Sequence, residues 1–289
     1  MGTFGDSWRL TKTSFRMIKE DKALLAFPAV AAGALLGILI MFAAGFFTLI
    51  FYQPIAGNAL YAILAVMAIA MYFILWFVGL YFLAALIGAA TLKLNGGNPK
   101  LADGLAIAKA HWKKILMWAL IAGTVGLIIQ AVSSRIKGIG GMIIGLAAQA
   151  TWGLATYFIL PVLIYEDLSA WGSLKRSASL YIHNFGRSFL SNIALAIIMG
   201  VAIFGAIILG VVGVYLLFSG LVIVGAALII VAIALAVLLV LIATAAEGIL
   251  TAALYRYATT GKIDEDLVNP AFVNATPNTG RPLPSSQSY

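Results

Sequence analysis

The stretch from Gly220 to Tyr257 reads GLVIVGAALIIVAIALAVLLVLIATAAEGILTAALYRY. It carries a single charged residue, Glu247, before Arg256. A helix needs about 20 apolar residues to cross the hydrocarbon core of a bilayer, and this run is about twice that long. No water-soluble fold offers a place for such a segment. We therefore predict a transmembrane helix over about 220–257 that extends past the bilayer at its C-terminal end.

The whole chain has the composition of a multi-pass membrane protein. Of its 289 residues, 63% are hydrophobic and 10% are charged, and the mean hydropathy is +1.06. Soluble domains average roughly 45–50% apolar and about 25% charged residues. The absence of cysteine excludes disulfides, thiol catalysis and zinc–thiolate sites, and two histidines are too few to build a metal site. We expect neither a metal nor a cofactor.

The apolar runs predict six spans separated by short turns, which makes the fold all-α, a membrane helical bundle. The first 262 residues form this membrane domain, and residues 263–289, with four prolines and a Pro-Ser-Ser-Gln-Ser motif, are expected to be a disordered tail. Pro161 is expected to kink the fourth span near its end. The predicted spans cover about 23–51, 59–94, 115–132, 139–165, 188–218 and 220–257.

Three amphipathic segments precede the odd-numbered spans, at about 4–20, 100–114 and 169–185. Each combines an apolar face with basic side chains, as is typical of a helix that lies in the membrane interface. The pattern predicts three repeated units, each made of an interfacial helix, an outward span and an inward span. Basic side chains on such helices either bind anionic lipid headgroups or only fix the topology. The candidate headgroup ligands are Arg9, Lys12, Arg16, Lys19, Lys109, Lys113, Lys175 and Arg176.

The distribution of positive charge predicts the orientation. Sixteen of the eighteen Lys and Arg residues lie in the two terminal regions and in the loops after spans two and four, whereas Arg135 and Lys137 lie on the opposite side. The positive-inside rule predicts that both termini lie on the cytoplasmic side of the cell membrane. It also explains the net charge of +8 without a nucleic-acid partner.

Glu247 is the sharpest functional candidate, because a carboxylate at membrane depth is costly and is a functional site by default. It lies nine residues before Arg256, which is roughly 13 Å along a helix. One interpretation is a proton, cation or substrate site formed with Asn192, Tyr157 and Thr156. The other is a polar clasp between helices, whose hydrogen bonds contribute about 0.6 kcal/mol on average.

Enzymatic signatures are missing from the sequence: there is no His-Glu-x-x-His, no Gly-x-Ser-x-Gly and no phosphate-binding loop. We therefore expect a protein that is not an enzyme. The leading hypothesis is a membrane scaffold or accessory subunit that binds anionic lipids, partner membrane proteins or further copies of itself. The alternative is a small-solute or ion transporter or channel that uses Glu247.

Three short motifs carry a family resemblance: TYFILP at 156–161 followed by Glu166, LKRS at 174–177, and LYRYA at 254–258. Together they resemble an uncharacterised family of archaeal and bacterial six-span membrane proteins. More loosely, they resemble the membrane domain attached to some glycerophosphodiester phosphodiesterases. The resemblance implies a helical membrane bundle without a known activity. It does not imply phosphodiesterase activity, because a catalytic barrel needs about 250 further residues.

Overall fold

The computed structural model describes residues 14–19, 21–52, 57–136, 138–183 and 185–260, and within these ranges all regular structure is helical. Residues 14–19 form a short helical segment. The amphipathic segment predicted at 4–20 is described only in that part, and the predicted tail lies outside the described residues. The other helices are α2 (Ala23–Tyr52), α3 (Asn58–Leu94), α4 (Leu101–Ala110), α5 (Trp112–Arg135), α6 (Ile139–Thr156), α7 (Ile159–Tyr165), α8 (Ala170–His183), α9 (Phe185–Phe218) and α10 (Val222–Thr260).

The predicted number of spans is confirmed. Six segments of the described chain are long and apolar enough to cross a membrane: α2, α3, α5, α6 together with α7, the part of α9 from Leu195 onward, and α10. Their bounds agree with the predicted spans to within a few residues at most ends. The chain is therefore a multi-pass, all-helical membrane protein.

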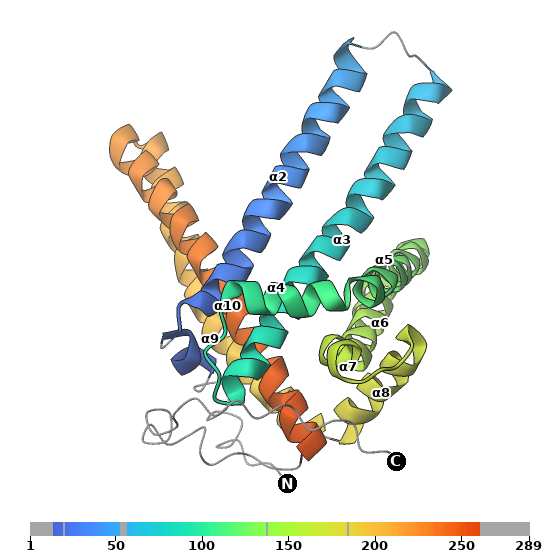
Figure 1. The fold of residues 1–289 in the computed structure, drawn as a ribbon. Helices are drawn as coiled ribbons and strands as arrows, with labels where there is room; N and C mark the ends of the chain where they lie inside the picture. The colour runs from blue at the N-terminus through green and yellow to red at the C-terminus, as the bar shows by residue number, and fades with distance from the viewer. Residues whose placement is uncertain (1–13, 20, 53–56, 137, 184, 261–289) are drawn as a thin grey trace.

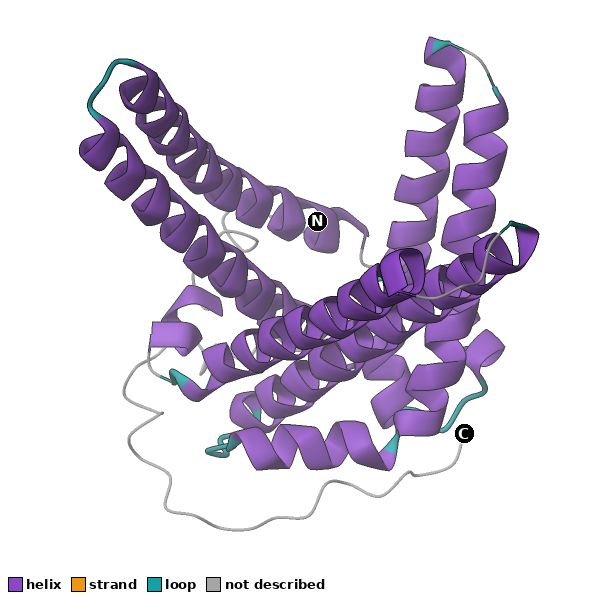
Figure 2. Ribbon diagram, turned by 90° about the horizontal axis from the view of Figure 1, so that it is seen from above, coloured by secondary structure: helices purple, strands orange, loops and turns teal. Residues whose placement is uncertain are grey.

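The six spans form three helical hairpins that splay apart, namely α2–α3, α5–α6 and α9–α10 (Figures 1 and 2). Within the third hairpin the backbones approach closely, since a Cβ added to Gly225 would lie 2.6 Å from the carbonyl oxygen of Gly213. Gly220 makes the turn with a φ of 88°, a conformation that costs glycine little. We call the closed end of each hairpin its turn end and the opposite end its converging end.

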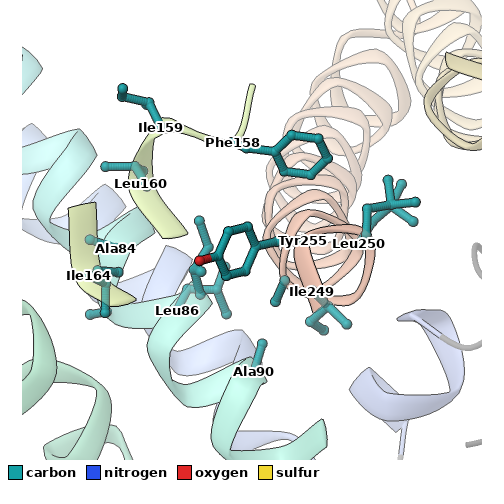
Figure 3. Packing of buried hydrophobic residues seen from close by; sticks show 14 of the residues in the cluster. Ala84, Leu86, Ala90, Phe158, Ile159, Leu160, Ile164, Ile249, Leu250 and Tyr255 are labelled. Carbon is teal, nitrogen blue, oxygen red and sulfur yellow. The ribbon is translucent and has the colours of Figure 1, made fainter. Parts of the chain in front are cut away.

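The hydrophobic core lies at the converging ends, where all three hairpins meet (Figure 3). Three runs supply most of it: Ala84–Ala90 of α3, Phe158–Ile164 around α7, and Ala245–Tyr255 of α10. The apolar faces of the short helices close this core, as Met17, Ala108 and Leu174 are buried there. Large apolar side chains toward the turn ends are mostly exposed, which suits a surface that faces lipid.

The second amphipathic segment ends earlier than predicted. Helix α4 stops at Ala110, the chain turns at His111, and Trp112 already begins α5. The His111 ring bonds to the carbonyl oxygen of Ile107 with Nδ1 at 2.9 Å. The predicted interfacial helix at 100–114 is thus wrong over its last four residues, because the turn at His111 divides a continuous amphipathic pattern.

The fourth span is broken, and the break lies four residues before Pro161 rather than at it. Helix α6 ends at Thr156, and α7 begins at Ile159. A proline cannot donate to the carbonyl four residues earlier, and its ring collides with that carbonyl. For Pro161 that carbonyl belongs to Tyr157, so the helix is interrupted at Tyr157 and Phe158.

Candidate polar site at the converging ends

In the described structure, Glu247 of the predicted intramembrane site forms no hydrogen bond or ion pair with Thr156 or Tyr157. Glu247 is exposed on α10 and makes no hydrogen bond or ion pair with any described residue. The Thr156 hydroxyl donates to the carbonyl of Trp152 in its own helix at 2.8 Å, and the Tyr157 ring packs against Tyr181 with 5.6 Å between centroids. Asn192 lies in α9, and its side chain is outside what the structure describes. The hypothesis of a shared site therefore stays a prediction.

The predicted headgroup ligands lie in several different surroundings. Among the described residues, Lys19, Lys109, Lys113 and Lys175 have exposed side chains and form no ion pairs. Lys113 lies over the ring of its neighbour Trp112, with 5.9 Å from Nζ to the centroid. Arg176 differs from them because it pairs with a carboxylate. Arg16 is half-buried, and Arg9 and Lys12 lie outside the described residues.

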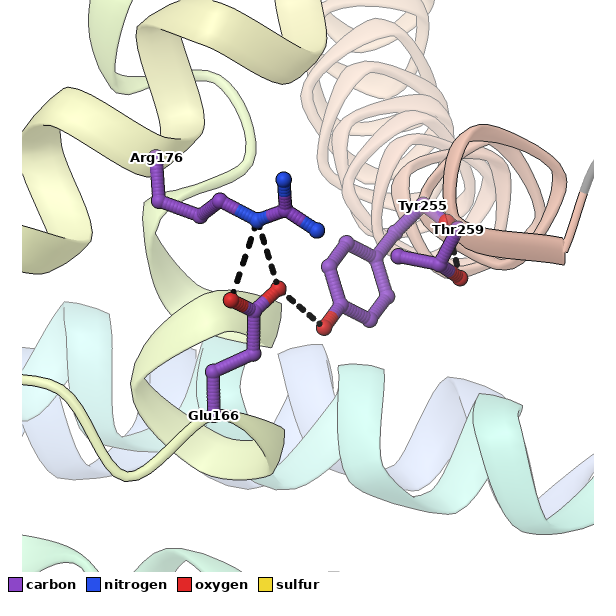
Figure 4. A network of polar contacts seen from close by, with 4 residues as sticks. All are labelled: Glu166, Arg176, Tyr255 and Thr259. Atoms are coloured by element: carbon purple, nitrogen blue, oxygen red, sulfur yellow. Dashed lines mark hydrogen bonds and ion pairs between the residues drawn. The ribbon is translucent and has the colours of Figure 1, made fainter. Parts of the chain in front are cut away.

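A polar network links three helices at the converging ends (Figure 4). Glu166 is the first residue after α7, and its carboxylate accepts from Arg176 Nε of α8 at 3.2 Å and 3.0 Å. The Tyr255 hydroxyl of α10 donates to Glu166 Oε1 at 3.1 Å. The Glu166 and Arg176 side chains are 24% and 43% exposed, so solvent screens the pair and its contribution to stability is modest. Its role is to fix the relative positions of α7, α8 and α10.

Further polar contacts tie the other converging ends. Lys114 of α5 pairs with Asp167 at 2.6 Å, and the Lys114 ammonium hydrogen bond lowers the pKa of the fully exposed Asp167 carboxyl. Lys93, near the end of α3, pairs with Asp21 just before α2 at 3.2 Å. Arg256 of α10 donates to the carbonyl of Leu94, the last residue of α3. Each contact joins segments that are adjacent at the converging ends.

Aromatic rings surround this network. Tyr255 stacks on Tyr165 with 6.2 Å between ring centroids and lies 6.4 Å from Phe158. On α8, burial raises the pKa of the Tyr181 phenol, and the Tyr181 ring is 6.2 Å from Phe158. The polar groups beside these rings are bonded to one another. This arrangement holds α7, α8 and α10 together at the junction.

Two other features bear on ligand binding. No three His, Cys, Asp or Glu side chains in the described part of the chain gather closely enough to hold a metal ion. An open apolar groove of about 480 Å³ lies between α2 and α3 and is lined by Leu35, Leu39, Tyr72, Leu75, Trp76, Gly79 and Leu80. The Tyr72 hydroxyl donates to the carbonyl oxygen of Gly123 at 3.1 Å, so this hydrogen bond is not offered to a ligand in the groove.

Comparison with known proteins places the chain in a family. Residues 58–265 match the model of a family of unknown function (DUF6159). The chain belongs to the DUF6159 family. No curated protein and no solved structure matches the chain. The DUF6159 match begins at the first residue of α3 and includes Glu166, Arg176 and Tyr255, so the network of Figure 4 lies entirely within the family region.

The sequence motifs contain the residues of this network, but they do not predict the bonds among them. Glu166, Arg176 and Tyr255 all fall in the stretches that carry the family resemblance. Arg176 was assigned to lipid headgroups, and Glu166 and Tyr255 were assigned no role. Their pairing could not be read from the sequence because Tyr255 is 89 residues from Glu166.

Proposed function

We propose that this protein is a non-enzymatic membrane scaffold that collects anionic lipids at the converging ends of its hairpins. The observation that carries the proposal is the contrast among its cations. Arg176 and Lys114 are paired with carboxylates, whereas Lys19, Lys109, Lys113 and Lys175 are exposed without ion pairs in the described structure. In the proposed orientation these four lysines face the cytoplasmic leaflet, which carries the anionic lipids.

The shape of the molecule supports a scaffold. A shared core and the polar ties fix the converging ends, whereas the splayed hairpins present exposed apolar faces to the bilayer (Figure 1). Such a form offers lipids or accessory proteins a large contact surface around a fixed base. The transporter alternative gains no support from the geometry, because Glu247 has no polar partner among the described residues.

The test is native mass spectrometry of the purified protein with phosphatidylglycerol and phosphatidylcholine that carry the same acyl chains. Each surface lysine contributes about 1 kcal/mol to attraction by anionic lipid, which is roughly five-fold in affinity. We expect Lys109→Gln and Lys175→Gln each to lower phosphatidylglycerol retention by about that factor or less, and the quadruple variant, with Lys19→Gln and Lys113→Gln added, to lose the preference over phosphatidylcholine.

Arg135→Gln is the matched control, because Arg135 is an exposed cation at the turn end of α5. It should leave lipid retention at the converging end unchanged. A quadruple variant that still prefers phosphatidylglycerol, or a control that loses the preference equally, would rule out the proposal.

A further inference from the structure

Helix α10 is long enough to cross a bilayer before it reaches its first charged residue. From Val222 to Ala246 the helix contains no charged residue, and Glu247 follows. These residues extend over about 37 Å, whereas the hydrocarbon core of a bilayer is about 30 Å thick. A carboxylate within the hydrocarbon is costly. The part of α10 before Glu247 is therefore sufficient to span the membrane by itself.

Exposed tyrosines mark where the bilayer begins at the turn ends. Tyr61 of α3 and Tyr215 of α9 are each 70% exposed, and tyrosine is enriched at membrane–water interfaces. A helix with the average tilt of about 20° crosses about 30 Å of hydrocarbon in roughly 21 residues. Counted from the two tyrosines toward the converging ends, this length leads to Phe82 of α3 and to Ala194 of α9. These two positions mark the expected second boundary of the bilayer.

The packing of α9 against α10 puts Glu247 at the second boundary. Gly213 of α9 lies against Ile229 of α10, since a Cβ added to this glycine would be 2.8 Å from the isoleucine side chain. The two helices form a hairpin, so each step back along α9 corresponds to one step forward along α10. In this register the position level with Ala194 is Gly248, which adjoins Glu247.

Helices α3 and α4 reach the same level as Glu247. A Cβ added to Gly248 would lie 3.5 Å from Leu83, the residue that follows Phe82. Beside them, the Tyr81 hydroxyl donates to the carbonyl of Leu105 in α4 at 3.4 Å. Helix α4 runs across the α2–α3 hairpin (Figure 1), as a helix in the membrane interface does. Glu247 and α4 therefore lie beside the turn of α3 at which the counted span ends.

Charged groups gather on the converging side of this level. Lys93 lies eleven residues past Phe82, about 16 Å along α3, and pairs with Asp21. The Asp167 side chain is 100% exposed and pairs with Lys114. An exposed carboxylate of this kind is costly in hydrocarbon and is readily accommodated in water. These groups therefore fit an aqueous surrounding.

We propose that the bilayer ends at the level of α4 and Glu247, so that the converging core projects out of the hydrocarbon. Glu247 then faces lipid headgroups and water. Trp112 and Lys113 follow α4 directly and are both exposed, and they anchor this level, because tryptophan rings and lysine side chains favour the headgroup region. The surface that contacts headgroups is formed by α4, Trp112, Lys113 and Glu247. This placement holds for neutral and for anionic lipids.

Single cysteines in this cysteine-free chain test the placement. Glu247→Cys and Ala106→Cys, the latter on the exposed face of α4, each carry a fluorophore in phosphatidylcholine nanodiscs. The lipid bears a nitroxide quencher on its headgroup or at the middle of its acyl chain. We expect the headgroup nitroxide to quench both fluorophores more strongly. Val237→Cys is the matched control, because Val237 is 53% exposed and lies about 15 Å from Glu247 toward the turn end; the mid-chain nitroxide should quench it more strongly.

A water-soluble maleimide gives a second readout on the unlabelled variants. Glu247→Cys and Ala106→Cys should react about ten-fold faster than Val237→Cys or more, because the reactive thiolate is excluded from hydrocarbon. Stronger mid-chain quenching at position 106 or 247, or a reaction as slow as that of Val237→Cys at either position, would overturn the proposal. Phosphatidylcholine carries no net charge, so a failure here is distinct from a failure of the lysines to select anionic lipid.

Discussion

The interruption between α6 and α7 leaves a backbone N–H that a side chain of α8 must satisfy. Substitutions at two serines of α8, Ser177 and Ser173, test which side chain does so. Because the helix is interrupted, the backbone N–H of Phe158 is bonded to Ser177 Oγ of α8 at 3.0 Å. Phe158 and Ser177 are both 0% exposed. Ser177→Ala removes the acceptor and leaves the N–H buried without a partner, which costs about 1–3 kcal/mol. The free energy of unfolding should fall by that amount.

Ser173 supplies a closely matched control one turn earlier on α8. Its side chain is also 0% exposed, and its hydroxyl makes no hydrogen bond with any described residue. Ser173→Ala creates a cavity of the same size but removes an unsatisfied polar group, whose burial is unfavourable. We expect unchanged stability, or a gain of up to about 1 kcal/mol. The two variants should therefore differ by roughly 2 kcal/mol, although the substitution is identical.

The assay is thermal unfolding in detergent, followed by tryptophan fluorescence. The stacked Trp118 and Trp152 rings lie close to the break, so their fluorescence reports unfolding of this region. A change of 2 kcal/mol corresponds to a shift in Tm of several degrees. Equal losses for Ser173→Ala and Ser177→Ala, or no loss for Ser177→Ala, would refute the assignment of Ser177 as the group that satisfies the interrupted backbone.

Two further predictions concern the junction of the helices. Tyr255→Phe removes the hydroxyl bonded to Glu166 and should lower the free energy of unfolding by about 1–2 kcal/mol; Tyr215→Phe, at a site 70% exposed on α9, should have no effect in the same thermal assay. Gly104→Ala should destabilise strongly, because its Cβ would lie 2.5 Å from a backbone carbonyl oxygen of α3. Gly153→Ala is the control, since nothing lies within 4 Å of that position, and its stability should be equal or higher.

The local features of the fold could be predicted well from the sequence, and the junction could not. The spans and the short turns between them follow from composition over neighbouring residues. The turn at His111 and the interruption before Pro161 were misplaced by a few residues, because periodicity fixes the ends of helices poorly. The candidate site was predicted less well than the fold. The assignment of the exposed lysines to lipid headgroups stays a prediction, and the bonds among Glu166, Arg176 and Tyr255 were not predicted.

The sequence by itself determined that this chain is a six-span membrane protein. Apolar runs of such length must form helices in a bilayer, since only a helix or a closed barrel satisfies every backbone polar group there. Only the tertiary structure decided that the hairpins meet at one end and diverge at the other, that Arg176 pairs with Glu166, and that Glu247 has no described partner. These outcomes depend on contacts between residues far apart in the chain, and the local pattern of hydrophobicity carries no information about such contacts.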